Sequence, residues 1–269
     1  MSNKIRIDKS GIKDEDREIA LNILKKLRIG ERVFGNPAEG LKKTLKKLDQ
    51  DIRDKSSHDP LDWKMSNKED IKQLMQIKAG INGELELARY IERIVKHDPS
   101  LNGVVFFSSL STKEEDIDEK GYIPDTDFVV AYGDNIMILD AKNLRIGENI
   151  PIYISGNFLS TPTNTIMELS PSNFFWEGVF KEEGYDVNIG GCVVIISKSR
   201  VLIFKNKEWY TSLCKPIYIG DLREYLINWI SSIKDKYVSL KLLTTLSKMQ
   251  IKKTKSDIDF GKTLNRFFR

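Results

Sequence analysis

The sequence has little of the two side chains that most often bind transition metals or form cross-links. Its 269 residues include two cysteines, Cys192 and Cys214, and two histidines, His58 and His97. The cysteines are too few and too far apart for a disulfide framework or a zinc-ligand motif. The histidines are too few for a histidine-based metal site or proton relay, and both lie in polar, loop-like sequence. We therefore expect neither histidine to be functional.

Long apolar runs are also absent. No stretch of about 18 apolar residues predicts a transmembrane helix. The first residues, MSNKIRIDKSGIKDED, contain no apolar signal region, and this predicts a cytoplasmic protein. The length of the chain suits either one large domain or a catalytic domain with extensions.

Charge is unevenly distributed along the chain, although the net charge is only +4. Residues 1–65 carry 16 Lys and Arg against 12 Asp and Glu, residues 66–231 carry 17 against 24, and residues 232–269 carry 10 against 3. An acidic centre between basic ends suits a polyanionic substrate, because the ends can neutralise phosphates. The alternative is that these are merely solvated charged helices. The division predicts an N-terminal helical extension, a central domain, and a basic C-terminal helix and tail.

Helical periodicity dominates the first third of the chain. Amphipathic helices are predicted over residues 14–34 and 37–55, and residues 55–65 are predicted to be a linker. A long helix is predicted from a capping box at Ser66 to about Val95. Gly80 and Gly83 should mark a kink, a break, or a close approach to a neighbouring element in that helix.

Strand patterns begin after this helix, so the chain is predicted to be an α/β protein with a central mixed sheet flanked by helices. The run 191–197 predicts a buried strand, with 201–204 pairing to it as a short hairpin. Residues 144–171 are predicted to be irregular apart from one short strand. The other predicted strands are 104–107, 128–131, 136–139, 152–154 and 216–219, and the other predicted helices are 172–184, 221–237 and 238–250.

The most informative stretch is the predicted hairpin between Gly121 and Asn143. Two apolar runs flank Gly133-Asp134-Asn135, which is typical of a tight turn between strands. Asp127 begins the first strand and Asp140 ends the second, so the two carboxylates should be neighbours. Lys142 should face the same side as Asp140, because side chains alternate along a strand.

This arrangement predicts a metal site that hydrolyses phosphodiester bonds. Divalent metal ions activate water and stabilise negative charge on phosphate, and Mg²⁺ prefers oxygen ligands. Asp127, Asp140 and the backbone carbonyl of Ala141 are the candidate ligands, and Glu84 on the long helix can complete the inner or outer ligand shell. Lys142 is placed to hold the attacking water or to stabilise the charge of the transition state.

Three blocks of sequence carry a resemblance to a known family. Gly80-Ile81-Asn82-Gly83-Glu84, Pro124-Asp125-Thr126-Asp127 with its following apolar strand, and Asp140-Ala141-Lys142-Asn143 resemble the PD-(D/E)XK nuclease superfamily, and more closely its nuclease-related domain (NERD) family. The resemblance covers roughly residues 75–200. It implies a restriction-endonuclease-like core, a Mg²⁺ or Mn²⁺ cofactor, and Glu84, Asp127, Asp140 and Lys142 as the catalytic set.

The match has departures and alternatives. The family often carries Asn-Pro-x-x-Gln on the following helix, whereas this chain retains only Asn173 and has Glu177 at the glutamine position. Asp125 is a second candidate for the role of Asp127. We prefer Asp127 because an apolar run follows it. Asp140 and Lys142 would otherwise be a solvated strand end, and Glu84 an exposed helical residue.

The sequence therefore predicts a metal-dependent endo- or exodeoxyribonuclease with nucleic acid, most simply DNA, as its partner. The alternative function is an inactive nuclease fold that binds DNA or serves as a scaffold. RNA is a further candidate substrate, although no RNA-recognition motif is present. No membrane partner is expected, and the terminal Phe267-Phe268 pair suggests docking on the body or a homo-oligomer.

Overall fold

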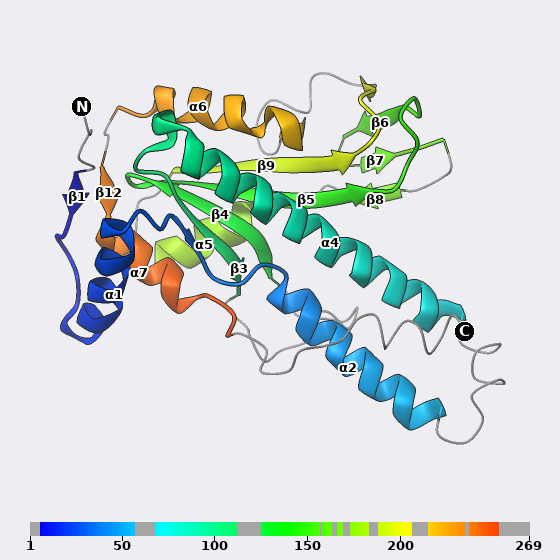
Figure 1. Ribbon diagram of the computed structural model, residues 1–269, viewed down its shortest axis with the longest axis horizontal. Coiled ribbons are helices and arrows are strands. Elements are labelled where there is room, and N and C mark those ends of the chain that lie inside the picture. Colours follow the sequence, from blue (N-terminus) through cyan, green and yellow to red (C-terminus); the bar gives the residue numbers. More distant parts are fainter. Residues whose placement is uncertain are drawn as a thin grey trace.

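A six-stranded mixed sheet with helices on both faces forms the centre of the molecule (Figure 1). The computed structural model describes residues 6–56, 68–111, 125–156, 158–162, 166–168, 173–182, 188–205, 215–234 and 237–252. The strand order is β11-β9-β5-β4-β3-β2. The strands span Val33–Phe34 (β2), Val105–Leu110 (β3), Thr126–Tyr132 (β4), Asn135–Leu144 (β5), Asn188–Ser197 (β9) and Lys215–Tyr218 (β11). The predicted α/β class with a mixed central sheet is confirmed.

The predicted hairpin is the antiparallel centre of this sheet. β4 pairs antiparallel with β5, with Phe128 opposite Leu139 and Tyr132 opposite Asn135. Gly133 takes φ +61° at the first central position of the turn, a conformation that favours glycine. β9 then lies parallel to β5 along ten residue pairs, so β5 is covered by a strand on each side.

One long helix, α4 (Lys68–His97), crosses the sheet (Figure 1). Its acidic first turn and basic last turn complement the helix dipole. The helix is continuous through Gly80 and Gly83, so of the three predicted possibilities the close approach is correct. A Cβ atom at Gly80 would lie 2.7 Å from Leu41 Cδ1, and one at Gly83 would lie 2.8 Å from Asn143 Cβ.

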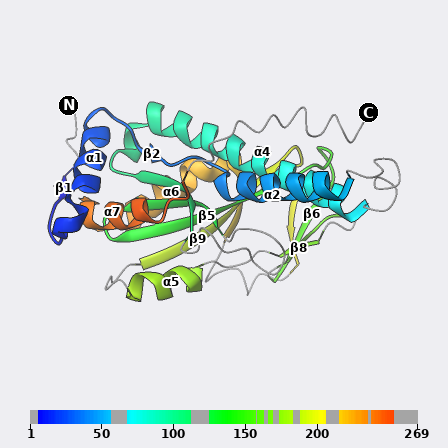
Figure 2. The same ribbon diagram turned by 90° about the horizontal axis from the view of Figure 1, so that it is seen from below.

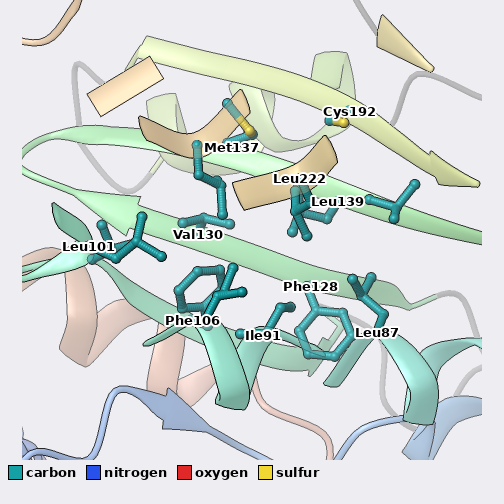
Figure 3. Packing of buried hydrophobic residues seen from close by; sticks show 14 of the residues in the cluster. Leu87, Ile91, Leu101, Phe106, Phe128, Val130, Met137, Leu139, Cys192 and Leu222 are labelled. Carbon is teal, nitrogen blue, oxygen red and sulfur yellow. The ribbon is translucent and has the colours of Figure 1, made fainter. Parts of the chain in front are cut away.

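Apolar side chains fill the space between the sheet and α4. Figure 3 shows Leu87 and Ile91 of α4 against Phe106 and Phe128 of the sheet. The helix α6 (Leu222–Ser232) adds Leu222 to the same cluster. The alternating strand residues point to this face, while the residues between them point to the other.

The opposite face of the sheet is covered by three shorter helices. These are α1 (Arg17–Arg28), α5 (Asn173–Glu182) and α7 (Leu240–Lys248). They pack on Val105, Phe107, Val129 and Ile138, and Figure 2 shows α4 and α5 on opposite sides of the sheet. The sheet is therefore buried on both faces, as its continuous apolar runs indicate.

A second, four-stranded sheet corrects two predictions. Its order is β10-β6-β7-β8, with strands Ile152–Ser155 (β6), Phe158–Ser160 (β7), Ile166–Glu168 (β8) and Leu202–Phe204 (β10). The region 144–171 is thus more regular than predicted. The predicted pairing of 201–204 with 191–197 is wrong: β10 pairs parallel with β6, and the Ile152 N–H donates to Val201 O at 2.8 Å.

The N-terminal segment is part of the same packed body. The helix predicted over 14–34 ends at Arg28 and is preceded by a 3-10 turn (Asp14–Asp16). The chain then joins the central sheet as β2, parallel to β3. The next helix, α2 (Glu39–Ser56), packs along α4 (Figure 1). The predicted domain boundary at residue 65 lies outside the described residues, and the contacts of residues 33–48 join this segment to the central domain.

The C-terminal segment returns to the N-terminal one. The helix predicted over 221–237 ends at Ser232, because Ile233 turns to extended backbone. The segment predicted to be a helix over 238–250 starts instead with a short strand, β12 (Val238–Ser239), which pairs parallel with β1 (Ile7–Asp8). The helix α7 follows it and packs against α1. The basic tail from residue 253 lies outside the described residues. No helix in the described part of the chain is both long and apolar enough to cross a membrane.

Candidate functional site

Three elements bring four carboxyl groups together beside the middle of α4. Glu84 comes from α4, Asp127 from β4, Asp125 from the residue before β4, and Asp140 from β5. Burial raises the pKa of Glu84 well above its usual range, and Asp127, Asp125 and Asp140 raise it further by charge repulsion. The three aspartates therefore lie close enough to Glu84 to act on its charge, and we call Glu84, Asp125, Asp127 and Asp140 the acidic cluster.

Glu84 is the deepest member of the acidic cluster. It is 3% exposed, so the alternative of an exposed helical residue is wrong. Its Oε2 accepts a hydrogen bond of 3.0 Å from the backbone N–H of Ala38. The two neighbouring glycines explain this position, because Gly80 admits Leu41 of α2 and Gly83 admits Asn143 of β5 close to the helix. The amide of Asn143 then donates to Ala79 O at 2.8 Å.

Asp127 and Asp140 stand at adjoining ends of the hairpin. The β4–β5 register reaches Phe128 opposite Leu139, and one further step places Asp127 opposite Asp140. Asp127 Oδ2 accepts a hydrogen bond of 2.6 Å from the Ala141 N–H. Burial raises the pKa of Asp127, as do Asp140 and Asp125, whereas Lys142 and the Ala141 N–H lower it. The predicted proximity of the two aspartates is confirmed.

Lys142 pairs with Asp140 at the open side of the cluster. Its Nζ lies 2.8 Å from Asp140 Oδ1, and the two side chains are 21% and 22% exposed. The predicted common orientation of these residues is thus confirmed. Both side chains are partly buried, so they are not a fully solvated strand end. Solvent still reaches both of them.

Asp125, the reserve candidate, belongs to the cluster. Its Oδ2 is buried without a hydrogen-bond partner. Burial raises the pKa of Asp125 to about 7, although hydrogen bonding from the backbone of Gly40 acts in the opposite direction. A buried carboxyl oxygen that lacks a donor is costly and is suited to receive a cation.

Sequence reasoning did not find the segment that closes the cluster on its buried side. This segment is Ala38–Gly40, at the start of α2. The N–H of Ala38 binds Glu84, and that of Glu39 donates to Ser109 Oγ at 3.0 Å. Ala38 and Ser109 are the non-glycine residues with positive φ in the described part of the chain, at 63° and 51°. Such strain persists only where surrounding contacts enforce it.

The donor atoms of the acidic cluster are all oxygens, the kind of ligand that hard divalent cations prefer. Within the described ranges, no three His, Cys, Asp or Glu side chains form a ready-made metal-binding group. In the cluster each of three carboxyls faces its own donor: Glu84 the Ala38 N–H, Asp127 the Ala141 N–H, and Asp140 the Lys142 ammonium. A carboxylate has two oxygens, so a hydrogen bond to one of them leaves the other able to bind an ion. The all-oxygen chemistry and the unpartnered Asp125 Oδ2 suit Mg²⁺ or Mn²⁺.

The remaining candidate residues lie apart from this cluster. Cys192 is a buried core residue and His97 is exposed at the end of α4. Asn173 and Glu177 lie on α5, and their side chains are outside the described structure. Cys214, His58 and Phe267-Phe268 are outside the described residues.

Comparison of the chain with family models, with curated proteins and with solved structures found no match.

Proposed function

We propose that the protein is a metal-dependent nuclease that hydrolyses phosphodiester bonds in DNA. The observation that carries the proposal is the acidic cluster, in which four carboxyls from α4, β4 and β5 converge beside the half-buried Asp140–Lys142 pair. Burying mutually repelling acids destabilises a fold, so such a cluster is typical of a functional site. The succession of α4, β3, β4 and β5 also supports a restriction-endonuclease-like core.

The metal would be held by Glu84, Asp127, Asp140 and the carbonyl of Ala141, with Asp125 as an additional carboxyl beside them. A bound Mg²⁺ or Mn²⁺ supplies an activated water and neutralises charge on the phosphate. The side chains are placed for these roles because Asp127 and Asp140 flank Ala141 on the hairpin and Glu84 faces them from α4.

The chain's own residues perform three tasks. Lys142 carries a positive charge on a partly exposed side chain beside Asp140, where it can orient a water molecule and stabilise negative charge on the phosphate. Asp140 holds the ammonium of Lys142 at 2.8 Å and so fixes its place. Gly83 lets α4 approach β5 closely enough for Glu84 to reach the hairpin.

DNA is the proposed substrate because the acidic centre is flanked by basic sequence at both ends, where Lys and Arg can neutralise phosphates. The test is incubation of plasmid and linear DNA with Mg²⁺ or Mn²⁺, comparing wild type with Lys142→Ala. We expect metal-dependent cleavage by wild type and a loss of about 100-fold or more in the variant, the range for removing one preorganised charge-stabilising group. Equal cleavage by the two proteins would refute the assigned site.

One observation favours the second candidate, a nuclease fold that binds DNA without cutting it. Three carboxyls of the cluster already face protein donors, so these three have partners without an ion. Under this candidate the protein binds DNA without added metal and cleaves neither DNA nor RNA. Calorimetric titration with Mn²⁺ separates the two candidates, because only the active nuclease requires binding.

A further inference from the structure

The start of α2 lies unusually close to Asp125. The backbone of Gly40 hydrogen-bonds toward this carboxyl. A Cβ atom at position 40 would lie 2.3 Å from Asp125 Oδ2, 2.4 Å from its Cγ and 2.8 Å from its Oδ1. No Cβ atom tolerates such distances, so any residue other than glycine at position 40 must displace the Asp125 side chain.

The same turn of chain also holds Glu84, through the N–H of Ala38 at 3.0 Å. The position of the segment Ala38–Gly40 is fixed by contacts on two sides. The Glu39 N–H donates to Ser109 Oγ, in the strand β3 beside β4, and Lys42 Nζ returns to Pro37 O at 2.8 Å and to Glu39 Oε1 at 3.0 Å. Glu39 and Ser109 are both buried. The segment is therefore anchored independently of the two carboxyls that it contacts.

We propose that Gly40, with the backbone of Ala38, is a positioning element of the acidic cluster, which sets where the carboxyls of Asp125 and Glu84 stand and thereby how tightly the cluster binds a divalent metal. This inference rests on the proposed function, since it assigns the metal site a wall built by the N-terminal segment. Gly40 acts through Asp125 by leaving room for its carboxyl. The N–H of Ala38 acts through Glu84 by holding its Oε2.

Helix propensity distinguishes the proposed contact with Asp125 from a role of Gly40 limited to the helix. Gly40 lies in the first turn of α2, where propensity alone favours Ala over Gly. A role limited to the helix therefore predicts that Gly40→Ala raises the melting temperature. The proposed contact predicts the opposite, because the added methyl group pushes the Asp125 carboxyl out of its place.

The experiment is a double-mutant cycle of wild type, Gly40→Ala, Asp125→Ala and the combined variant. Each protein is measured by calorimetric titration with Mn²⁺ and, without metal, by thermal unfolding. Gly178→Ala is the matched control, because a Cβ atom at that helical glycine on α5 meets nothing within 4 Å. We expect Gly40→Ala to weaken Mn²⁺ binding about 10-fold or more, the range for residues that orient metal ligands, and Gly178→Ala to leave it unchanged.

The decisive result is the behaviour of Gly40→Ala once Asp125 is absent. In the Asp125→Ala background we expect the substitution to leave Mn²⁺ affinity unchanged and to raise the melting temperature, because the methyl group then meets no carboxyl and only the higher helix propensity of Ala remains. If Gly40→Ala alone prevents folding, restoration of the fold in the combined variant supports the same contact. Wild-type affinity in Gly40→Ala, or an equal loss in both backgrounds, would overturn the proposal.

Failure of the proposed function is a different outcome. A wild-type protein that folds but binds no Mn²⁺ refutes the metal site and, with it, the effect of Gly40 on affinity. The unfolding measurements without metal still decide the positioning role: non-additive changes support contact between Gly40 and Asp125, and additive changes refute it.

Discussion

Glu84 and Ile91 lie two turns apart on the same face of α4, and both are buried, at 3% and 0% exposed. Ile91 packs into the apolar cluster between α4 and the sheet (Figure 3). Glu84 instead meets three aspartates that raise its pKa. The same face of α4 therefore has opposite effects on stability: burial of Ile91 stabilises the fold, whereas burial of Glu84 opposes folding.

The difference between Glu84 and Ile91 shows that position 84 carries a residue that stabilises the fold less than an apolar residue would. An apolar residue at position 84 would continue the stripe of Leu74, Ile77, Ile81 and Ala88. A carboxyl there loses its hydration and approaches like charges, both of which disfavour its ionised form. Local departures from consistent packing are expected at functional sites. Contrasting substitutions on this face should therefore change stability in opposite directions.

The largest effect is expected at the apolar end of the comparison. Ile91→Ala removes a fully buried side chain from the main cluster, and such truncations lower the free energy of unfolding by about 2–5 kcal/mol. Denaturant unfolding without metal measures this loss. A loss below about 1 kcal/mol would show that the cluster relaxes around position 91 and would weaken the contrast with Glu84.

At the acidic end, the expected sign is reversed. Glu84→Gln keeps the shape of the side chain and removes a carboxyl whose ionisation is disfavoured by burial, so the metal-free protein at pH 8 should gain about 0.5–2 kcal/mol. Denaturant unfolding measures the gain, and Glu86→Gln on the exposed face of α4 is the control, with an expected change within about 0.5 kcal/mol. A destabilised Glu84→Gln would indicate that the Ala38 N–H requires a charged acceptor.

Added Mn²⁺ should reverse the order of these two proteins. An ion that binds only the folded state stabilises it by about 2.7 kcal/mol at 100 times its dissociation constant. Wild type should gain this stability, whereas Glu84→Gln should gain much less because it has lost a proposed ligand. Equal stabilisation of both proteins would place the ion away from Glu84.

The parts of the fold with regular periodicity could be predicted from the sequence. Four apolar residues on either side of Gly133-Asp134-Asn135 suffice to predict a hairpin, and α4 has an apolar stripe along its whole length. The second sheet and β2 could not be predicted, because strands of two to four residues carry no measurable period. Their pairing is fixed by distant contacts, such as β10 with β6.

For the candidate site, sequence reasoning brought Asp127, Asp140 and Lys142 together because strand alternation dictates their common side. Glu84 carried a further signal, since it interrupts an apolar stripe at a position that helical spacing places inside. The contribution of Ala38–Gly40 had no such signal. Its N–H groups bind irrespective of side chain, and its partners lie 46 residues or more along the chain.

The last expected effect is a change of stability with pH, and it concerns Asp125. Its pKa is about 7 in the folded protein and about 3.9 in an unfolded chain. Between these values the folded state binds more protons than the unfolded state, so stability falls as pH rises from about 4 to 7 and stays lower above that range. The raised pKa values of Glu84 and Asp127 act in the same direction.

Asp125→Asn should flatten this slope, because the amide carries no titrating proton. One proton contributes at most about 1.4 kcal/mol per pH unit, and the difference between variant and wild type isolates its share from other titrating groups. Denaturant unfolding of both metal-free proteins from pH 4.5 to 8 measures it. The variant should gain on wild type as pH rises, with the gain complete near pH 8. Parallel profiles of stability against pH would mean that Asp125 has the same pKa in the folded and unfolded chains. Only Glu84, Asp127 and Asp140 would then remain as buried acids that oppose folding.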